Sequence, residues 1–267
     1  MLGAIIGDIV GSKYEFNNIK TKDFKLFDND MLFTDDTVLT VAIYEALKEC
    51  NGNYKNLGEY AKKTITKYVE LYPYKSYGGM FLDWISTPNQ LKKPYNSFGN
   101  GAAMRVSPVA FFANSISEVK ELSRKVTEIT HNHKEGIKGA EATAVAIYLA
   151  LQGCSKDEIK KEMQKYYDFN FTIEKIKNSY SFNETCMHTV PQALEVFFES
   201  LNFEDCIRLG ISLGGDSDTL CAIAGSVAEA YYGIPKNIKN QAYTYLDNNI
   251  LNKVYEFYEN CKYEKIK

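Results

Sequence analysis

The chain has 267 residues, of which 45% are hydrophobic, and its formal net charge is −3 at pH 7. This length suits one large domain or two small ones, and no run of Lys or Arg provides an arm that would hold a nucleic acid by charge alone. The six cysteines are scattered without a CxxC pair, which favours reduced core thiols over a disulfide framework or a zinc site. No signal peptide and no apolar run of ~20 residues is evident, so we expect a cytoplasmic protein without membrane attachment.

Helical periodicity dominates the chain, because apolar residues recur at spacings of three and four and strand-like alternation is rare. Residues 1–267 contain no obvious linker or repeat, so they are predicted to form one compact all-α domain. The expected helices cover residues 34–50, 56–71, 101–113, 117–130, 135–152, 155–167, 188–200, 203–212, 217–232 and 236–260. Ser117, Ser155 and Asn202 are the predicted N-caps of three of these helices.

The N-terminal segment places Gly3, Gly7 and Gly11 at four-residue spacing. Small residues on one face let a helix approach its neighbours closely, so we expect a packed helix with Asp8 and Glu15 at its edge. Glu is almost never buried without a partner. Glu15 considered alone is therefore predicted to be exposed, and its role depends on what lies beside it in the fold.

Two short acidic clusters each begin an apolar helical run, at residues 34–37 (TDDT) and 214–219 (GGDSDT). Asp and Thr are common helix caps, so capping explains either cluster alone. The duplication and the spacing of Asp216 and Asp218 favour more than capping, since residues two apart share a side in an extended chain. If the two helix ends converge, four carboxylates surround one point, which is stable only around hard cations such as Mg²⁺ or Mn²⁺.

Residues 72–108 break the helical pattern and contain four of the six prolines of the chain. A long irregular segment in a helical domain is either a tolerated surface loop or a functional one. This segment also contains seven aromatic residues, which are too many for a solvated connector. The composition therefore favours a loop that faces a substrate.

Within that segment, residues 97–105 (SFGNGAAMR) place glycines directly before a helix. Such backbone forms an anion-binding nest that suits phosphate, and a tight turn is the alternative. Arg105, one turn into the helix, is placed to pair with a carboxylate. Phe98 is placed to lie against a ribose or a base.

His131 and His133 precede another predicted helix. Two histidines without a nearby Cys do not make up a zinc site. The remaining alternatives are simple helix capping and a hydrogen bond from His131 to a hydroxyl or phosphate of a substrate. His188 is predicted to be structural.

At these residues the chain resembles the ADP-ribosylglycohydrolase family, which includes the dinitrogenase reductase-activating glycohydrolases and the ADP-ribosylserine and ADP-ribosylarginine hydrolases. The matching segments occur in family order between residues 3 and 233. They are GAIIGDIVGSKYE, FTDDTVLTVA, SFGNGAAMRVSPV, ITHNHKEGIKGAEA, TVPQALEVF and GGDSDTLCAIAGSVAEAYYG. The combination of TDDT with a late GGDSDT carries the resemblance, because each of the other segments is weak alone.

The resemblance implies an all-α fold with two Mg²⁺ or Mn²⁺ ions in a central cleft, and Glu15 matches the family's acid beside the metals. The residues that match the metal ligands are Thr34, Asp35, Asp36, Asp216, Asp218 and Thr219. The residues that match the substrate contacts are Ser97, Phe98, Gly99, Asn100, Gly101, Ala102 and His131. Phe98 stands where some relatives have Tyr. Residues 72–95 match the family least, so the resemblance does not imply which leaving group the reaction releases.

The implied reaction is hydrolysis of the bond between C1″ of ADP-ribose and an acceptor atom, with Glu15 or Asp36 as the base. One alternative is a metal-dependent phosphohydrolase that splits ADP-ribose at its diphosphate, and another is a non-catalytic ADP-ribose binder of the same fold. Retention of all six ligand positions argues against a pure binder. We expect a monomer whose substrate is an ADP-ribosylated protein, nucleic acid or small molecule.

Overall fold

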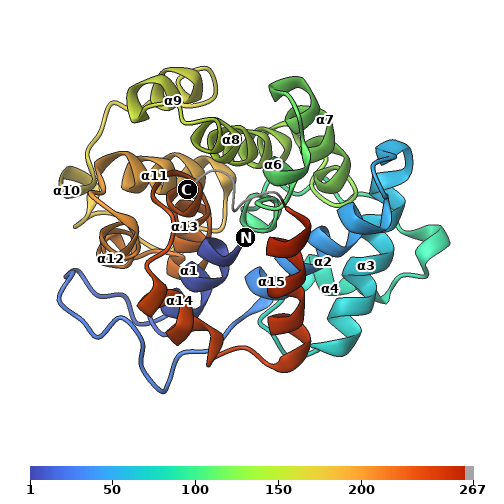
Figure 1. Ribbon diagram of the computed structural model, residues 1–267, viewed down its shortest axis with the longest axis horizontal. Helices are drawn as coiled ribbons and strands as arrows, with labels where there is room; N and C mark the ends of the chain where they lie inside the picture. Colours follow the sequence, from blue (N-terminus) through green and yellow to red (C-terminus); the bar gives the residue numbers. More distant parts are fainter. Residues whose placement is uncertain (262–267) are drawn as a thin grey trace.

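Two helices from distant parts of the sequence pack against each other at the centre of the molecule (Figure 1). In the computed structural model, which describes residues 1–261, they are α1 (Leu2–Ser12) and α13 (Ser217–Tyr232). Their backbones touch at the predicted glycines, since a Cβ on Gly7 would lie 2.1 Å from the carbonyl oxygen of Cys221. Only glycine permits this approach, so the small-residue face is a packing surface.

The other helices surround this pair, with α8, α11 and α12 packed directly on α13 and α2 packed on α3. They are α2 (Asp35–Glu49), α3 (Leu57–Leu71), α4 (Gly79–Ser86), α5 (Gly101–Arg105), α6 (Val109–Phe112), α7 (Ile116–Thr127), α8 (Lys134–Leu151), α9 (Lys156–Met163), α10 (Ile173–Ile176), α11 (Cys186–Glu199), α12 (Phe203–Leu213), α14 (Lys236–Tyr243) and α15 (Asn248–Asn260). Two short 3₁₀ helices, η1 (Tyr54–Asn56) and η2 (Asn89–Leu91), complete the set in residues 1–261.

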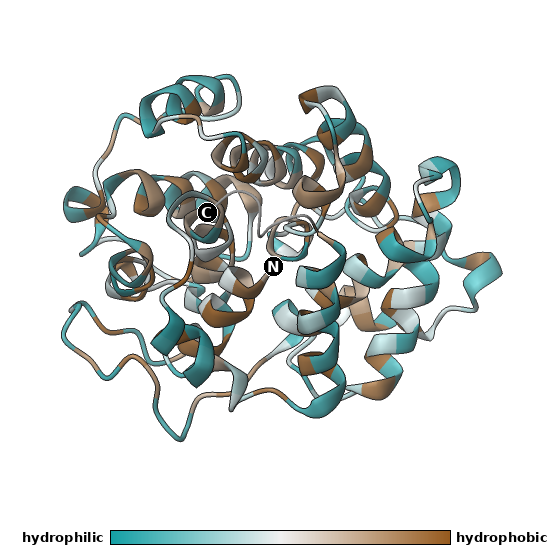
Figure 2. Ribbon diagram, in the orientation of Figure 1, coloured by the Kyte–Doolittle hydropathy of each residue, from teal (hydrophilic) through white to brown (hydrophobic). Residues whose placement is uncertain are grey.

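The predicted all-α class is confirmed. Residues 1–261 form no β-sheet, and one isolated bridge joins Gly99 to Thr185. Buried apolar side chains from Met1 to Cys261 form one cluster, while the peripheral helices α9 and α14 are mostly hydrophilic (Figure 2). Among the described helices, none has both the length and the apolar character that crossing a bilayer requires. The last residues of the predicted domain, 262–267, lie outside the described residues.

Two of the predicted helices are broken in the structure. The expected helix 101–113 is divided into α5 and α6, because Pro108 has no N–H to continue the first helix and instead precedes the second. The expected helix 236–260 is divided into α14 and α15. Asp247 begins the second of these as its N-cap, and its Oδ1 accepts a hydrogen bond from the backbone N–H of Ile250 at 3.0 Å.

The prediction of an irregular segment at residues 72–108 is wrong for residues 79–86, which form α4. Tyr77, Phe81 and Trp84 are buried and their rings contact one another in series, at centroid distances of 5.7 and 5.8 Å. The burial of these rings stabilises a helix that the surrounding Gly and Pro residues do not suggest. Much of the aromatic content of this segment therefore belongs to the core.

Candidate metal centre and substrate cleft

The two acidic clusters meet at neighbouring helix N-termini. Asp35 and Asp36 begin α2, while Asp216 is the N-cap of α13 and Asp218 lies in its first turn. A hydrogen bond joins the clusters directly, because Thr219 Oγ1 donates to Asp36 Oδ2 at 3.3 Å across 183 positions of sequence. The convergence that the sequence predicts is therefore present in the fold.

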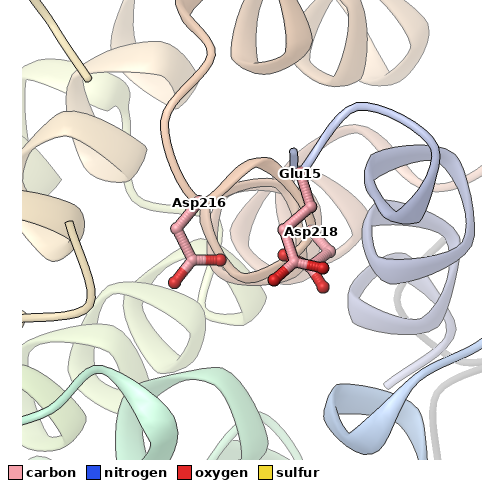
Figure 3. A group of neighbouring side chains, drawn as sticks. All are labelled: Glu15, Asp216 and Asp218. Atoms are coloured by element: carbon pink, nitrogen blue, oxygen red, sulfur yellow. The ribbon is translucent and has the colours of Figure 1, made fainter. Parts of the chain in front are cut away.

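Glu15, which follows α1, joins the second cluster at the N-terminal end of α13 (Figure 3). One carboxylate oxygen from each of Glu15, Asp216 and Asp218 lies within 4.8 Å of the other two. Burial, followed by the negative charges of Asp216 and Asp8, raises the pKa of Glu15 from 4.5 to about 7. Glu15 is thus not the isolated exposed acid that its own position in the sequence predicts.

Among residues 1–261, none of the carboxylates in this centre has a cationic side chain at ion-pair distance. Burial, with neighbouring acids adding to it, raises the pKa of Asp35, Asp36 and Asp218 well above the ordinary value. Asp36 Oδ1 is buried and has no hydrogen-bond partner among residues 1–261. Buried charges need compensation, and a donor set made only of oxygens suits a hard cation such as Mg²⁺ or Mn²⁺. The residues present therefore fit such an ion.

A cavity of about 710 Å³ connects these acids with the glycine-rich loop. This volume is within the range of small-molecule binding sites. The predicted site residues that line it are Glu15, Asp35, Asp36, Ser97, Phe98, Gly99, Asn100, Gly101, His131, Asp216, Asp218 and Thr219. Thr34 and Ala102 are buried and are not among the lining residues.

Asp8 stabilises the segment that carries the first acidic cluster by accepting hydrogen bonds from it, a role that the sequence does not suggest. Its carboxylate is fully buried and accepts hydrogen bonds from the backbone N–H of Thr34 at 2.9 Å and of Thr37 at 3.0 Å. The hydroxyls of both threonines donate to it as well. Asp8 thus caps the N-terminus of α2 from another helix, and the Thr34 hydroxyl is directed to Asp8 instead of the cavity.

Asn18 joins the segment around Glu15 to the second acidic cluster by hydrogen bonds, and the sequence does not predict this role either. Its Oδ1 accepts from the backbone N–H of Gly215 at 2.6 Å, and its Nδ2 donates to the carbonyl oxygen of Gly215 at 2.9 Å. The same Nδ2 donates to the carbonyl oxygen of Tyr14. Because Gly215 directly precedes Asp216, these bonds fix Glu15 and Asp216 relative to each other.

Asn100 connects the glycine-rich loop with the acidic centre. Its Nδ2 donates to Asp216 Oδ2 at 2.7 Å, and its backbone N–H donates to the carbonyl oxygen of Glu184 at 2.8 Å. Phe98, in the same loop, is 45% exposed and its ring contacts that of His133 edge-on at 5.3 Å. One end of the loop is therefore anchored beside the acids, while Phe98 stays accessible.

The expected pairing of Arg105 with a carboxylate is wrong. Its guanidinium is buried, donates from Nη2 to Thr130 Oγ1 at 2.8 Å, and has no carboxylate at ion-pair distance within residues 1–261. Arg105 does not reach the acids because it extends toward the C-terminal end of α7. His188 is not among the residues that line the cavity, as expected for a structural residue.

A family model described as ADP-ribosylglycohydrolase matches residues 1–261. The chain belongs to this family. The ADP-ribosylhydrolase ARH3 of Xenopus tropicalis is 27% identical, and the match covers 92% of this chain and 91% of that protein. The ADP-ribosylarginine hydrolase Tri1 of Pseudomonas putida is 25% identical, over 88% of this chain and 70% of that protein.

A solved structure described as an ADP-ribosylglycohydrolase-related protein complex has the same fold as this family member. Its TM-score is 0.71 and its sequence identity 19%, over 97% of this chain and 95% of that one. The resemblance inferred from the sequence is confirmed, and the protein is an enzyme of the class that hydrolyses glycosyl bonds.

Proposed function

We propose that this ADP-ribosylglycohydrolase is a metal-dependent ADP-ribosyl hydrolase that cleaves the bond between C1″ of ADP-ribose and an acceptor. The observation that carries the proposal is that Glu15 and both acidic clusters line one cavity with the glycine-rich loop. The residues proposed to hold two Mg²⁺ or Mn²⁺ ions are Asp35, Asp36, Asp216, Asp218 and Thr219. Thr34 is proposed as a further ligand, because its hydroxyl donates its proton to Asp8 and keeps its oxygen lone pairs for a cation.

In this proposal Glu15 is the base. Bound divalent cations would supply Lewis acidity that makes the attacking water more acidic. Glu15 lies beside Asp216 and Asp218 and is accessible from the cavity, so its carboxylate can accept the proton of that water. Positive charge develops at C1″ in the transition state, and the surrounding carboxylates stabilise it electrostatically. Asp36 is the second candidate for the base.

The other side of the cavity is proposed to hold the ADP-ribosyl group. Ser97, Phe98, Gly99, Asn100, Gly101 and His131 line it, and glycine-rich backbone before a helix suits phosphate oxygens. Ala102 does not line the cavity, so we propose that it acts only through the backbone at the start of α5. The predictions of one domain over residues 1–267, a monomer and a cytoplasmic location stay predictions.

A panel of ADP-ribosylated substrates tests the proposal. Proteins modified on Arg or Ser, a modified nucleic acid and a small-molecule ADP-ribose ester are incubated with Mg²⁺, with Mn²⁺ and with chelator. We expect free ADP-ribose to be released from at least one of them in a metal-dependent manner. AMP together with ribose 5-phosphate would show a phosphohydrolase instead, and binding without any product would show a non-catalytic binder.

A further inference from the structure

Arg105, Thr130 and His131 form a chain of three buried polar side chains beside the cavity, and Arg105 and His131 are among the residues that line it. Arg105 Nη2 donates to Thr130 Oγ1 at 2.8 Å, and that hydroxyl is also 2.8 Å from Nδ1 of His131. Arg105 is 1% exposed, Thr130 is fully buried and His131 is 5% exposed. Water therefore does not compete for these contacts, and each proton position follows from the donors and acceptors present.

The Thr130 hydroxyl has one proton to donate, and the groups around it decide which acceptor receives that proton. A guanidinium can only donate, so Thr130 Oγ1 accepts from Arg105. The carbonyl oxygen of Thr127 is a poor alternative acceptor, because it lies 3.4 Å from Oγ1 and already accepts the backbone N–H groups of Thr130 and His131. The hydroxyl proton therefore goes to Nδ1 of His131. A neutral imidazole that accepts at Nδ1 carries its proton on Nε2.

The ring of His131 is held with Nε2 toward the glycine-rich loop. His131 lines the cavity, and a Cβ on Gly101 would lie 3.4 Å from Nε2. Within residues 1–261, Nε2 has no hydrogen-bond partner. The ring contacts that of Tyr95 at 5.9 Å, and Gly136 leaves it room, since a Cβ there would lie 3.1 Å from the Cβ of His131.

We propose that Arg105 and Thr130 are positioning residues, which hold His131 as the neutral tautomer with its proton on Nε2, where it donates a hydrogen bond to an oxygen of the bound ADP-ribosyl group. The ligand part of this inference rests on the proposed function. A phosphate oxygen only accepts hydrogen bonds, so the opposite tautomer would present a lone pair to it and repel it. Burial and the positive charge of Arg105 also lower the pKa of His131 well below its usual value, which agrees with a neutral ring.

The tautomer is measured on the ligand-free protein by ¹⁵N NMR of the histidine ring nitrogens, assigned by comparison with a His131→Gln sample. At pH 7 we expect the shift of a protonated nitrogen at Nε2 and of an unprotonated nitrogen at Nδ1. A proton on Nδ1, or a doubly protonated ring, would overturn the inference. This measurement does not depend on activity, so it stands apart from the proposed function.

Titrations with two ligands then identify the oxygen that accepts the hydrogen bond from His131. ADP-ribose should shift the Nε2–H resonance. An equal shift with ADP, which keeps the diphosphate but lacks the second ribose, identifies a phosphate oxygen, whereas a shift with ADP-ribose alone identifies a ribose oxygen. Binding of ADP-ribose with no shift would contradict donation by His131. No binding of ADP-ribose at all would overturn both the ligand part of the inference and the proposed function.

Two variants of Thr130 separate positioning from general stability. Thr130→Ser keeps the hydroxyl, and Thr130→Val removes it at nearly constant shape. One weakened hydrogen bond corresponds to roughly a 3–10-fold change in affinity. We therefore expect Thr130→Val to raise KM by roughly that factor with kcat little changed, and Thr130→Ser to stay near the wild type. Equal KM values for the two folded variants would contradict the role of Thr130, and the wild-type spectrum decides the tautomer if Thr130→Val does not fold.

Discussion

Replacement of Glu15 by Gln should change stability and activity in opposite directions. In the metal-free protein the pKa of Glu15 is raised from 4.5 to about 7, because the side chain is buried near Asp216 and Asp8. A raised carboxyl pKa means that the folded state binds the proton more tightly than the unfolded chain does. The ionised Glu15 therefore destabilises the fold, with no effect below about pH 4.5 and the full effect above about pH 7.

The difference between 4.5 and about 7 corresponds to at most about 3.4 kcal/mol of unfolding free energy. Glu15 is only partly buried, and solvent screening reduces this to about 1–2 kcal/mol. Without metal, Glu15→Gln should therefore stabilise the protein by about 1–2 kcal/mol at pH 8 and by much less at pH 5. Turnover of the metal-loaded enzyme should fall by about 10²–10⁴-fold, the usual loss for one positioned acid–base group.

Urea unfolding in chelator at pH 5 and pH 8 measures the stability change, with Glu70→Gln as the control because Glu70 is exposed and away from the cavity. Calorimetric titration with ADP-ribose in the presence of metal separates the two roles of Glu15. Full-strength binding without turnover fits a base, whereas a parallel loss of metal and substrate affinity fits a metal ligand. Wild-type turnover together with an unchanged stability at pH 8 would refute the reasoning.

Three further changes are predicted. Mg²⁺ at about 100 times its Kd should raise the free energy of unfolding by about 2.7 kcal/mol, and chelator should remove both this gain and the activity, as calorimetry and product assays would show. Asp8→Asn puts an NH₂ donor against the N–H groups at the start of α2 and should lower the free energy of unfolding by about 1–3 kcal/mol, as measured in urea. The control Asp30→Asn, at an 80% exposed side chain, should leave it almost unchanged. Gly7→Ala places its Cβ 2.1 Å from the Cys221 oxygen and should cost at least about 3 kcal/mol, whereas Gly78→Ala, with nothing within 4 Å, should be tolerated in the same assay.

The helical elements were largely readable from the sequence, because periodicity and capping are local. Ser155 and Asn202 are N-caps as predicted, and Ser155 forms a capping box with Glu158. The cap of α7 is Ser115 and not the predicted Ser117, since Asn114 and Ser115 together bind the Glu118 side chain and backbone. The sequence does not predict helix α4, because this helix depends on the burial of its aromatic residues and not on a local helical pattern.

For the site, the sequence by itself determined which acids and glycines were candidates, since the TDDT and GGDSDT motifs are each contiguous. The family resemblance placed Glu15 beside them, although its own local sequence did not, and the tertiary structure shows the contact. Only the tertiary structure decided that Asp8 caps α2 and that Asn18 binds the backbone of Gly215, 197 positions away. These contacts exist because the glycine face of α1 lets it pack directly on α13, which brings the residues that follow α1 to the start of α13. Hydrogen bonds of this range depend on how helices pack, and no local pattern in the chain encodes their partners.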